Sequence, residues 1–190
     1  MEAIIQWDKD LFNFLNHCCY SGPMDTFMLW VTDKWIWIPF YAVLLFFVYK
    51  CFKKKILWIL LAVGLMVAST DVISTRVFKN NVQRWRPCRE EANLDFEVRT
   101  LSNVNCSQYG FVSSHAANTF GLAVFLGLLF FNKKRWPLFA LLFWSALVSF
   151  SRIYLGVHYP LDVLCGALVG GFCAFVFYFC FRGFWKEKVE

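Results

Sequence analysis

The sequence contains few charged residues and few histidines. Both shortages restrict the classes of protein to which it can belong. Charged side chains make up 17% of the 190 residues, and three residues are histidine. The net charge of +6 is modest, and the basic residues cluster at the ends of apolar runs, which argues against a nucleic-acid-binding stripe. The spacing of the cysteines and histidines matches no zinc site, so the sequence predicts neither a metal nor another cofactor.

Targeting and repeat features are missing as well. The first 19 residues carry three acids and have neither a basic n-region nor a small-residue cleavage site, so no cleavable secretory signal is predicted. No internal repeat and no low-complexity linker divides the chain. The sequence therefore predicts a single domain over residues 1–190.

Apolar and aromatic residues are abundant instead. Hydrophobic residues make up 59% of the chain and aromatic residues 21%, with 23 Phe and 9 Trp. A soluble domain of this length needs no such excess. The composition therefore favours an all-α polytopic membrane protein, a bundle of transmembrane helices.

Apolar runs of membrane-spanning length define this bundle. A span needs roughly 20 residues, and four runs come close to that length: 56–78, 115–132, 136–153 and 161–181. A fifth run, 36–52, is shorter and reaches full length only by recruiting part of residues 24–35. We therefore predict five spans, with six as the alternative.

The N-terminal residues have a different pattern. Between residues 3 and 17, apolar and polar side chains alternate with helical periodicity. Such a pattern is typical of an amphipathic helix that lies in the membrane interface. We predict an interfacial helical segment over residues 1–34.

The basic clusters predict the orientation. All of them fall on one side of the membrane under this span assignment, and the positive-inside rule makes that side cytoplasmic; they are Lys53 to Lys55, Lys133 to Arg135, and Arg182, Lys186 and Lys188. The nearly neutral loop 80–114 then lies outside. These features and the short loops favour the inner (cytoplasmic) membrane of a bacterium, with the loop facing the periplasm.

The outer loop contains Cys88 and Cys106, which would have access to an oxidising compartment. A disulfide between them would close a loop of about 17 intervening residues and contribute around 3 kcal/mol to stability. Two free thiols are the alternative.

Three clusters of polar residues lie at the outer ends of the predicted spans, where ionisable groups are expensive and usually functional. The first holds Lys79, Arg86 and Pro87; seven residues are almost two helical turns, so Lys79 and Arg86 would face the same way before Pro87 ends the helix. The second runs from Val112 to His115, where Ser113 or Ser114 can cap a helix and leave backbone N–H groups for an anion. The third runs from Ser151 to Asp162.

Each cluster alone has an ordinary explanation: snorkelling basic residues, a helix cap, or a hydrogen-bonded interfacial histidine. Together they place two of the three histidines and three basic residues on the side that should be poor in positive charge. A guanidinium, an imidazole and a carboxylate within one short segment, from Arg152 through His158 to Asp162, indicate phosphate chemistry.

These clusters resemble the type 2 phosphatidic acid phosphatases, which are membrane-embedded lipid phosphate phosphatases. The family pattern is K-x6-R-P, then P-S-G-H, then S-R-x5-H-x3-D, and it covers about half of this chain. The first and third parts match fully, including Gly156. In the second part Val112 replaces the proline and Ser114 replaces the glycine, while Ser113 and His115 remain.

The resemblance implies a mechanism that needs no metal. His158 would attack phosphorus and form a phosphohistidine, with Asp162 orienting its ring. His115 would protonate the leaving oxygen and then activate water. The phosphate oxygens would be held by the remaining polar residues of the motifs: Lys79, Arg86, Arg152, Ser113 and Ser114.

Asp71 lies eight residues before Lys79 within a span, and an acid there should have a partner. We expect it either to support the phosphate-binding side chains or to form an internal hydrogen bond with a Ser or Thr of a neighbouring helix. The sequence does not identify an oligomeric state.

The expected partner is a membrane lipid whose tail stays in the bilayer while its phosphate enters the basic pocket. Undecaprenyl pyrophosphate ranks first and lipid A second, with phosphatidylglycerol phosphate and phosphatidic acid as further candidates. A vanadate-dependent haloperoxidase is disfavoured by the spans. A non-catalytic lipid binder or transporter would have no need of His115 and His158.

Overall fold

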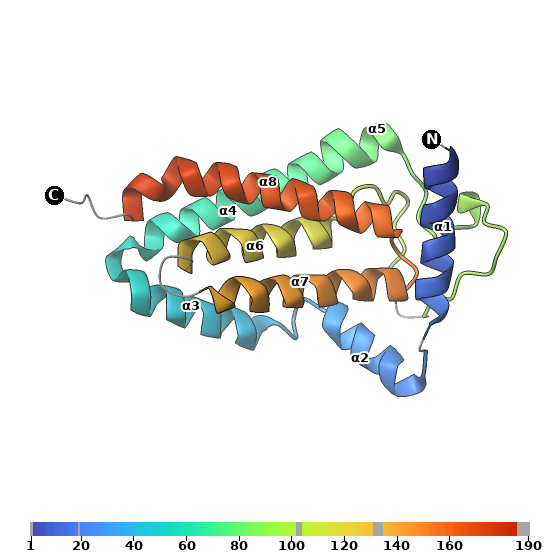
Figure 1. Cartoon of the computed structure of the whole chain (residues 1–190), viewed down its shortest axis with the longest axis horizontal. Coiled ribbons are helices and arrows are strands. Elements are labelled where there is room, and N and C mark those ends of the chain that lie inside the picture. The colour runs from blue at the N-terminus through green and yellow to red at the C-terminus, as the bar shows by residue number, and fades with distance from the viewer. Residues whose placement is uncertain (1, 19, 102–103, 131–134, 186–190) are drawn as a thin grey trace.

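A computed structural model of the chain describes residues 2–18, 20–101, 104–130 and 135–185. Within these residues, long apolar helices run side by side and a shorter helix crosses one end of them (Figure 1). The bundle helices are α3 (Ile38–Phe52), α4 (Ile56–Val72), α6 (Ser114–Phe130), α7 (Trp136–Tyr154) and α8 (Pro160–Trp185). The described residues contain no β-strand, and a single antiparallel bridge pairs Trp85 with Tyr109.

The bundle helices have the length and composition of membrane spans. Among the described residues, the helical stretches Ile38–Val82, Trp136–Tyr154 and Pro160–Phe184 are long and apolar enough to cross a membrane, and Ser114–Phe130 is a shorter apolar helix. The first stretch is two helices, because the 3-10 turn η1 (Lys53–Lys55) reverses the chain between α3 and α4 (Figure 1). The predicted all-α membrane bundle is confirmed, whereas the number of spans remains a prediction.

The helix boundaries differ from the predicted ones where the backbone changes its winding. The helix that begins with α4 continues through a π-helical segment, η2 (Ile73–Lys79), into the short α5 (Asn80–Val82). The proposed extension of the fifth run is a separate helix, α2 (Gly22–Thr32). The chain leaves the helix at Asp33, and α3 restarts with a proline in its first turn. The predictions that involve Asn132, Lys133, Lys134, Lys186 and Lys188 lie outside the described residues.

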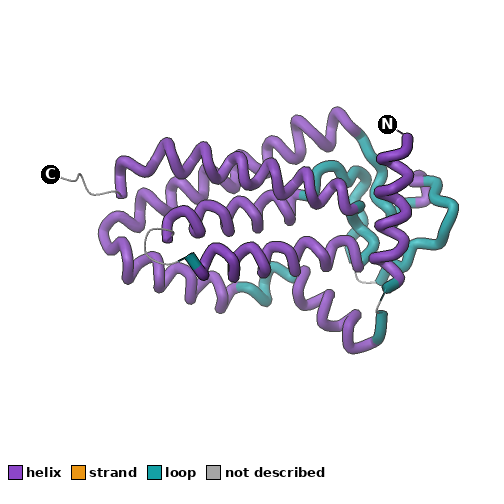
Figure 2. The backbone as a smooth tube through the Cα atoms, in the orientation of Figure 1, coloured by secondary structure: helices purple, strands orange, loops and turns teal. Residues whose placement is uncertain are grey.

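The two ends of the bundle differ in kind. The α3–α4 turn, the start of α7 and the end of α8 lie together at one end, and with them the basic residues Lys53 to Lys55, Arg135 and Arg182 (Figure 1). The longest loop segments gather at the opposite end, next to α1 (Figure 2). The described basic clusters and the outer loop therefore lie at opposite ends, as the positive-inside argument required.

The pairing of α6 with α8 positions the functional end of the bundle. Gly170 of α8 packs directly against the carbonyl of Ala117 on α6, and a Cβ at Gly170 would have no room. Small residues allow this close approach between membrane helices. Because both helices run in the same direction (Figure 1), their N-terminal ends lie side by side.

Helix α1 (Glu2–His17) lies across the end of the bundle that carries the long loop (Figure 1). Its buried residues Asp8, Phe12 and Asn16 are spaced by four and form one face. Trp7 and Phe14 remain exposed. The structure therefore contains the predicted amphipathic helix, and its place in the membrane interface stays a prediction.

The loop between α5 and α6 corresponds to the predicted outer loop. It contains the short 3-10 turn η3 (Glu90–Ala92) and a disulfide between Cys88 and Cys106. Because Cys88 follows Arg86 and Pro87 directly, the disulfide ties the segment that carries Arg86 to the returning part of the loop.

Candidate active site

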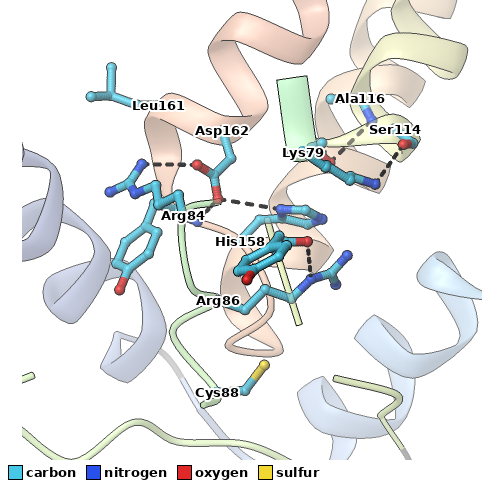
Figure 3. A network of polar contacts seen from close by, with 12 residues as sticks. Lys79, Arg84, Arg86, Cys88, Ser114, Ala116, His158, Leu161 and Asp162 are labelled. Atoms are coloured by element: carbon cyan, nitrogen blue, oxygen red, sulfur yellow. Dashed lines mark hydrogen bonds and ion pairs between the residues drawn. The ribbon is translucent and has the colours of Figure 1, made fainter. Parts of the chain in front are cut away.

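The residues of the three sequence motifs converge at the end of the bundle crossed by α1. Each comes from the end of a helix or from the adjoining loop, and Figure 3 shows several of them around His158. The set consists of Lys79 in η2, Arg86 in the outer loop, Ser113, Ser114 and His115 at the start of α6, Arg152 at the end of α7, His158 in the α7–α8 turn, and Asp162 in the first turn of α8.

His158 and Asp162 form a buried pair. Asp162 Oδ2 lies 3.4 Å from His158 Nδ1 and accepts a hydrogen bond from the backbone N–H of Tyr159 at 3.0 Å. Both side chains are almost completely removed from solvent. Since Nδ1 faces the carboxylate, Nε2 is the ring nitrogen left for a ligand.

The turn that carries His158 requires glycine at position 156. Gly156 has φ of +75°, and a Cβ there would lie 2.9 Å from the carbonyl oxygen of Arg99. The turn is closed by the carbonyl of Arg152, which accepts hydrogen bonds from the N–H groups of Val157 and His158 at 3.0 and 3.3 Å. Gly156 therefore supports the site by fixing the path of the chain into His158.

The cations of the motifs are held by neutral groups. Arg86 Nε donates to the carbonyl of Tyr109 at 3.1 Å, and Lys79 Nζ donates to Ser114 Oγ at 2.9 Å. Arg152 donates to Thr32 Oγ1 at 2.5 Å, and its buried Nε has no hydrogen-bond partner. Among the described residues, no carboxylate forms an ion pair with these three side chains. Their charge is available to an anion.

Burial and neighbouring cations decide the protonation of His158. Burial of the ring, followed by the charges of Arg86, Arg152 and Lys79, lowers the pKa of His158 well below its usual value. A neutral imidazole with a free nitrogen is the form that can attack phosphorus. His115, an exposed residue at the start of α6, lies within electrostatic reach of His158 and the same three cations.

The start of α6 is locked to α8 through Ser113. Its backbone N–H donates to the carbonyl of Asp162 at 2.9 Å, and its Oγ accepts the N–H of Ala116 at 3.5 Å, as an N-cap does. The hydroxyl of Ser114, which stands where the resembled family has glycine, holds the ammonium of Lys79 (Figure 3).

The predicted shared helical face of Lys79 and Arg86 is wrong. The helix ends at Val82, because Gln83 adopts a left-handed conformation with φ of 49°. Arg86 then lies in extended backbone beside the returning loop, where its N–H donates to the carbonyl of Gln108 at 3.3 Å. Pro87 therefore follows an extended segment and does not end a helix, as the restricted backbone before proline allows.

Asp71 is bonded to the neighbouring helix α6. Asn118 donates to its Oδ1 at 2.9 Å, and Asn118 in turn accepts a hydrogen bond from Thr70. The charge of Asp71 also acts on Lys79. A role in positioning the site stays a prediction.

Three residues that sequence reasoning did not select also lie at the site. Arg84 Nη1 donates to Asp162 Oδ1 at 2.9 Å, and Arg84 Nη2 donates to Asp8 Oδ2 at 2.6 Å. Gly110 packs against Asp162, Arg86 and His158. The basic pair two residues apart, Arg84 and Arg86, was a usable signal for the first of these. Asp8 had none, since it belongs to a helix predicted for its amphipathic pattern alone.

Replacement of Gly110 by alanine is expected to lower kcat about tenfold while leaving the fold intact. An added Cβ would lie 2.9 Å from Asp162 Oδ2 and 3.5 Å from His158 Nδ1, so the pair must shift. Gly171→Ala is the matched control, because nothing lies within 4 Å of a Cβ there. Equal turnover of the two purified variants would contradict this account of Gly110.

Comparison with known proteins gives three findings. The sequence pattern of the PAP2 superfamily matches residues 55–186. A lipid A 4'-phosphatase of Bacteroides thetaiotaomicron is 37% identical over 180 residues, covering 94% of this chain and 79% of that protein. An undecaprenyl-diphosphatase of Sulfolobus acidocaldarius is 28% identical over 179 residues, covering 92% and 79%.

Among solved structures, the chain resembles a transmembrane PAP2 type phosphatidylglycerolphosphate phosphatase from Bacillus subtilis. The TM-score is 0.71, with 97% of this chain and 87% of that chain covered. At 21% identity this likeness concerns the fold.

Proposed function

This chain belongs to the PAP2 superfamily and is a membrane lipid phosphatase, and from that premise we propose that it removes the 4'-phosphate of lipid A through a phosphohistidine on His158. The observation that supports this chemistry best is the buried His158, whose Nδ1 faces Asp162. Its neighbours Lys79, Arg86 and Arg152 form no ion pair with a carboxylate of the described residues. A pocket for binding alone would not require an oriented, neutral imidazole.

In the first step His158 Nε2 donates its lone pair to phosphorus and the bond from phosphorus to the lipid oxygen breaks. His115, protonated once the charge of the bound phosphate balances the surrounding cations, supplies the proton that the leaving oxygen takes up. Lys79, Arg86 and Arg152 carry the positive charge that stabilises the phosphoryl oxygens as the transition state forms.

In the second step water attacks phosphorus, His115 accepts its proton, and the phosphorus–nitrogen bond breaks to return neutral His158 and release phosphate. Asp162 balances the positive charge of the phosphorylated ring between the two steps. The backbone N–H groups at the start of α6, next to Ser113 and Ser114, add donors for the same oxygens.

The ranking of the candidate substrates differs from the ranking that the sequence alone suggested. Undecaprenyl pyrophosphate ranked first there, but the relative named as a lipid A 4'-phosphatase is 37% identical and the undecaprenyl-diphosphatase 28%. We therefore place lipid A first and undecaprenyl pyrophosphate second, because both relatives extend over nearly the whole chain.

The protein is a multi-pass membrane protein, as its bacterial relatives are. We propose that its active site lies at the periplasmic face of the inner membrane. The basic α3–α4 turn and the end of α8 lie at the opposite end of the bundle, which supports a cytoplasmic location for that end (Figure 1).

The test is phosphate release by the purified protein from a panel of lipid A, undecaprenyl pyrophosphate, phosphatidylglycerol phosphate and phosphatidic acid. We expect the fastest release from the 4' position of lipid A, identified by mass spectrometry of the product. Hydrolysis of lipid added outside intact spheroplasts tests the orientation. Release from another lipid alone would overturn the substrate assignment, and release from none of the panel would overturn the proposed function.

A further inference from the structure

Arg84 lies between the carboxylates of Asp8 and Asp162, next to the catalytic His158. It donates through Nη1 to Asp162 at 2.9 Å and through Nη2 to Asp8 at 2.6 Å. Its guanidinium also stacks on the ring of Tyr159, 3.9 Å from the ring centroid. Figure 3 shows the guanidinium directed at the carboxylate of Asp162, on the opposite side from His158.

Asp8 is a fully buried carboxylate on a helix that otherwise packs through Phe12 and Asn16. Besides Arg84, it accepts the backbone N–H of Leu161 at 2.9 Å. Leu161 directly precedes Asp162 in the first turn of α8. Asp8 therefore holds both the guanidinium that contacts Asp162 and the backbone that carries Asp162.

We propose that Arg84 and Asp8 are positioning residues of the phosphatase: Arg84 fixes the carboxylate of Asp162 toward His158, and Asp8 fixes Arg84, so that α1 is part of the catalytic centre. This inference rests on the proposed function of His158 and Asp162. Arg84 stands at one of the six unspecified positions of the first motif, Asp8 lies outside all three motifs, and 76 positions separate the two residues.

The hydrogen bonds of Asp162 explain why Arg84 is needed. Oδ2 accepts from Tyr159 and faces His158, whereas Oδ1 has Arg84 as its hydrogen-bond donor. Without Arg84, a buried oxygen would lose its charged partner, which is strongly unfavourable. The carboxylate would then rotate away from His158 or take up a proton, and either change removes the charge that balances the phosphorylated ring.

Charge balance sets the expected direction of a pH effect. His158 faces Lys79, Arg86, Arg152 and His115, in addition to Asp162. Burial opposes the charge on Arg84, but Asp162 and Asp8 raise the pKa of Arg84 above its usual value, so it is a permanent cation. Loss of this cation makes the His158–Asp162 pair take up a proton at higher pH.

A purely structural role would consist in holding α1 against the bundle. Asn16 provides an independent comparison, because it anchors the same helix without touching Arg84. It donates to the carbonyls of Arg99 and Tyr154 at 3.0 and 2.9 Å and accepts the N–H of Arg99 at 2.9 Å. If docking alone matters, Asn16→Ala and Asp8→Asn should act alike.

The test measures kcat, KM and the pH profile of lipid phosphate hydrolysis by purified variants. Arg84→Gln should lower kcat about 10²-fold with little change in KM, and move the acid limb of kcat/KM to higher pH. Arg84→Lys should restore part of the loss. Asp8→Asn should lower kcat about tenfold and add nothing to Arg84→Gln, because the two residues act in series. The matched controls Arg89→Gln and Asp10→Asn, both at exposed positions, should keep wild-type values.

A second readout needs no substrate. With three histidines in the chain, ¹⁵N-histidine NMR in detergent can be assigned by His17→Gln and His115→Gln. The pH midpoint of the His158 ring should rise in Arg84→Gln and stay unchanged in Arg89→Gln. If wild type hydrolyses no lipid phosphate, the proposed function fails while this midpoint still decides the role of Arg84.

Wild-type kcat and an unchanged His158 midpoint in Arg84→Gln would overturn the proposal. A loss of kcat without a shift of the pH profile, reproduced by Asn16→Ala, would overturn it too, since it would show that docking of α1 is sufficient.

Discussion

The His158→Ala variant is expected to release phosphate from lipid A at least ~10²–10⁴-fold more slowly than wild type. The imidazole forms the bond to phosphorus, and its Nδ1 is already occupied by Asp162. The neighbouring His115 lies within electrostatic reach of His158 and would serve the leaving group. The rate of phosphate release by the purified protein in detergent measures the effect.

His17→Ala is the control for the loss of an imidazole, because His17 is exposed on α1 and its ring contacts the carbonyl of Asn13 in the same helix. Quenching of wild type in alkaline detergent during turnover of ³²P-labelled lipid should trap label on the protein, stable in base and labile in acid. The label should be absent from His158→Ala. Normal turnover or undiminished labelling of that variant would refute the nucleophile assignment.

The motif residues were predictable because polar groups stand out at the ends of apolar runs. The four-residue spacing from His158 to Asp162 indicated that the two side chains lie close together, and they do, although His158 stands in the turn before α8 and the pair does not share a helical turn. The resemblance to a family fixed the remaining assignments. The fold class needed composition and the length of the apolar runs, because in lipid every backbone group must be satisfied within a helix or a closed barrel, and runs of about 20 residues fit a helix.

Contacts between distant segments were not predictable in the same way. The ion pair between Arg84 and Asp8 depends on α1 folding across the bundle end, and no periodicity in residues 3–17 specifies where that helix docks. The helix ends at Val82, and the segment that follows pairs through Trp85 with Tyr109 on the other side of the outer loop. Tertiary pairing of this kind overrides local helical preference.

The N-terminal segment contacts the site through both of its helices. Its α1 places Asp8 against Arg84, and the last residue of α2, Thr32, accepts the hydrogen bond of Arg152. Helix α2 therefore contacts a cation assigned to the phosphate site, and α1 contacts the residue that holds Asp162, although the sequence indicated only a segment at the membrane interface. An amphipathic pattern predicts which face of a helix is buried, and it leaves open what that face contacts.

Asp162→Asn is expected to fold like wild type and to lose activity by roughly 10³–10⁴-fold. The carboxylate accepts from Arg84 at one oxygen and from the Tyr159 N–H at the other. An amide of the same size has one acceptor, so its NH₂ group must face either Arg84 or the Tyr159 N–H, and both are donors. One buried donor loses its partner in either orientation, and the positive phosphohistidine ring loses its counter-charge.

Measurement of kcat together with the thermal unfolding midpoint separates a loss of catalysis from a loss of stability. Asp95→Asn, an exposed acid in the outer loop, is the matched control and should keep wild-type turnover. We expect the phosphohistidine to form too slowly in Asp162→Asn to accumulate, because the ring is no longer held with Nε2 free and its positive charge is uncompensated. A folded Asp162→Asn protein with wild-type kcat would exclude Asp162 as the group that orients His158, and the positioning role of Arg84 would then have no target.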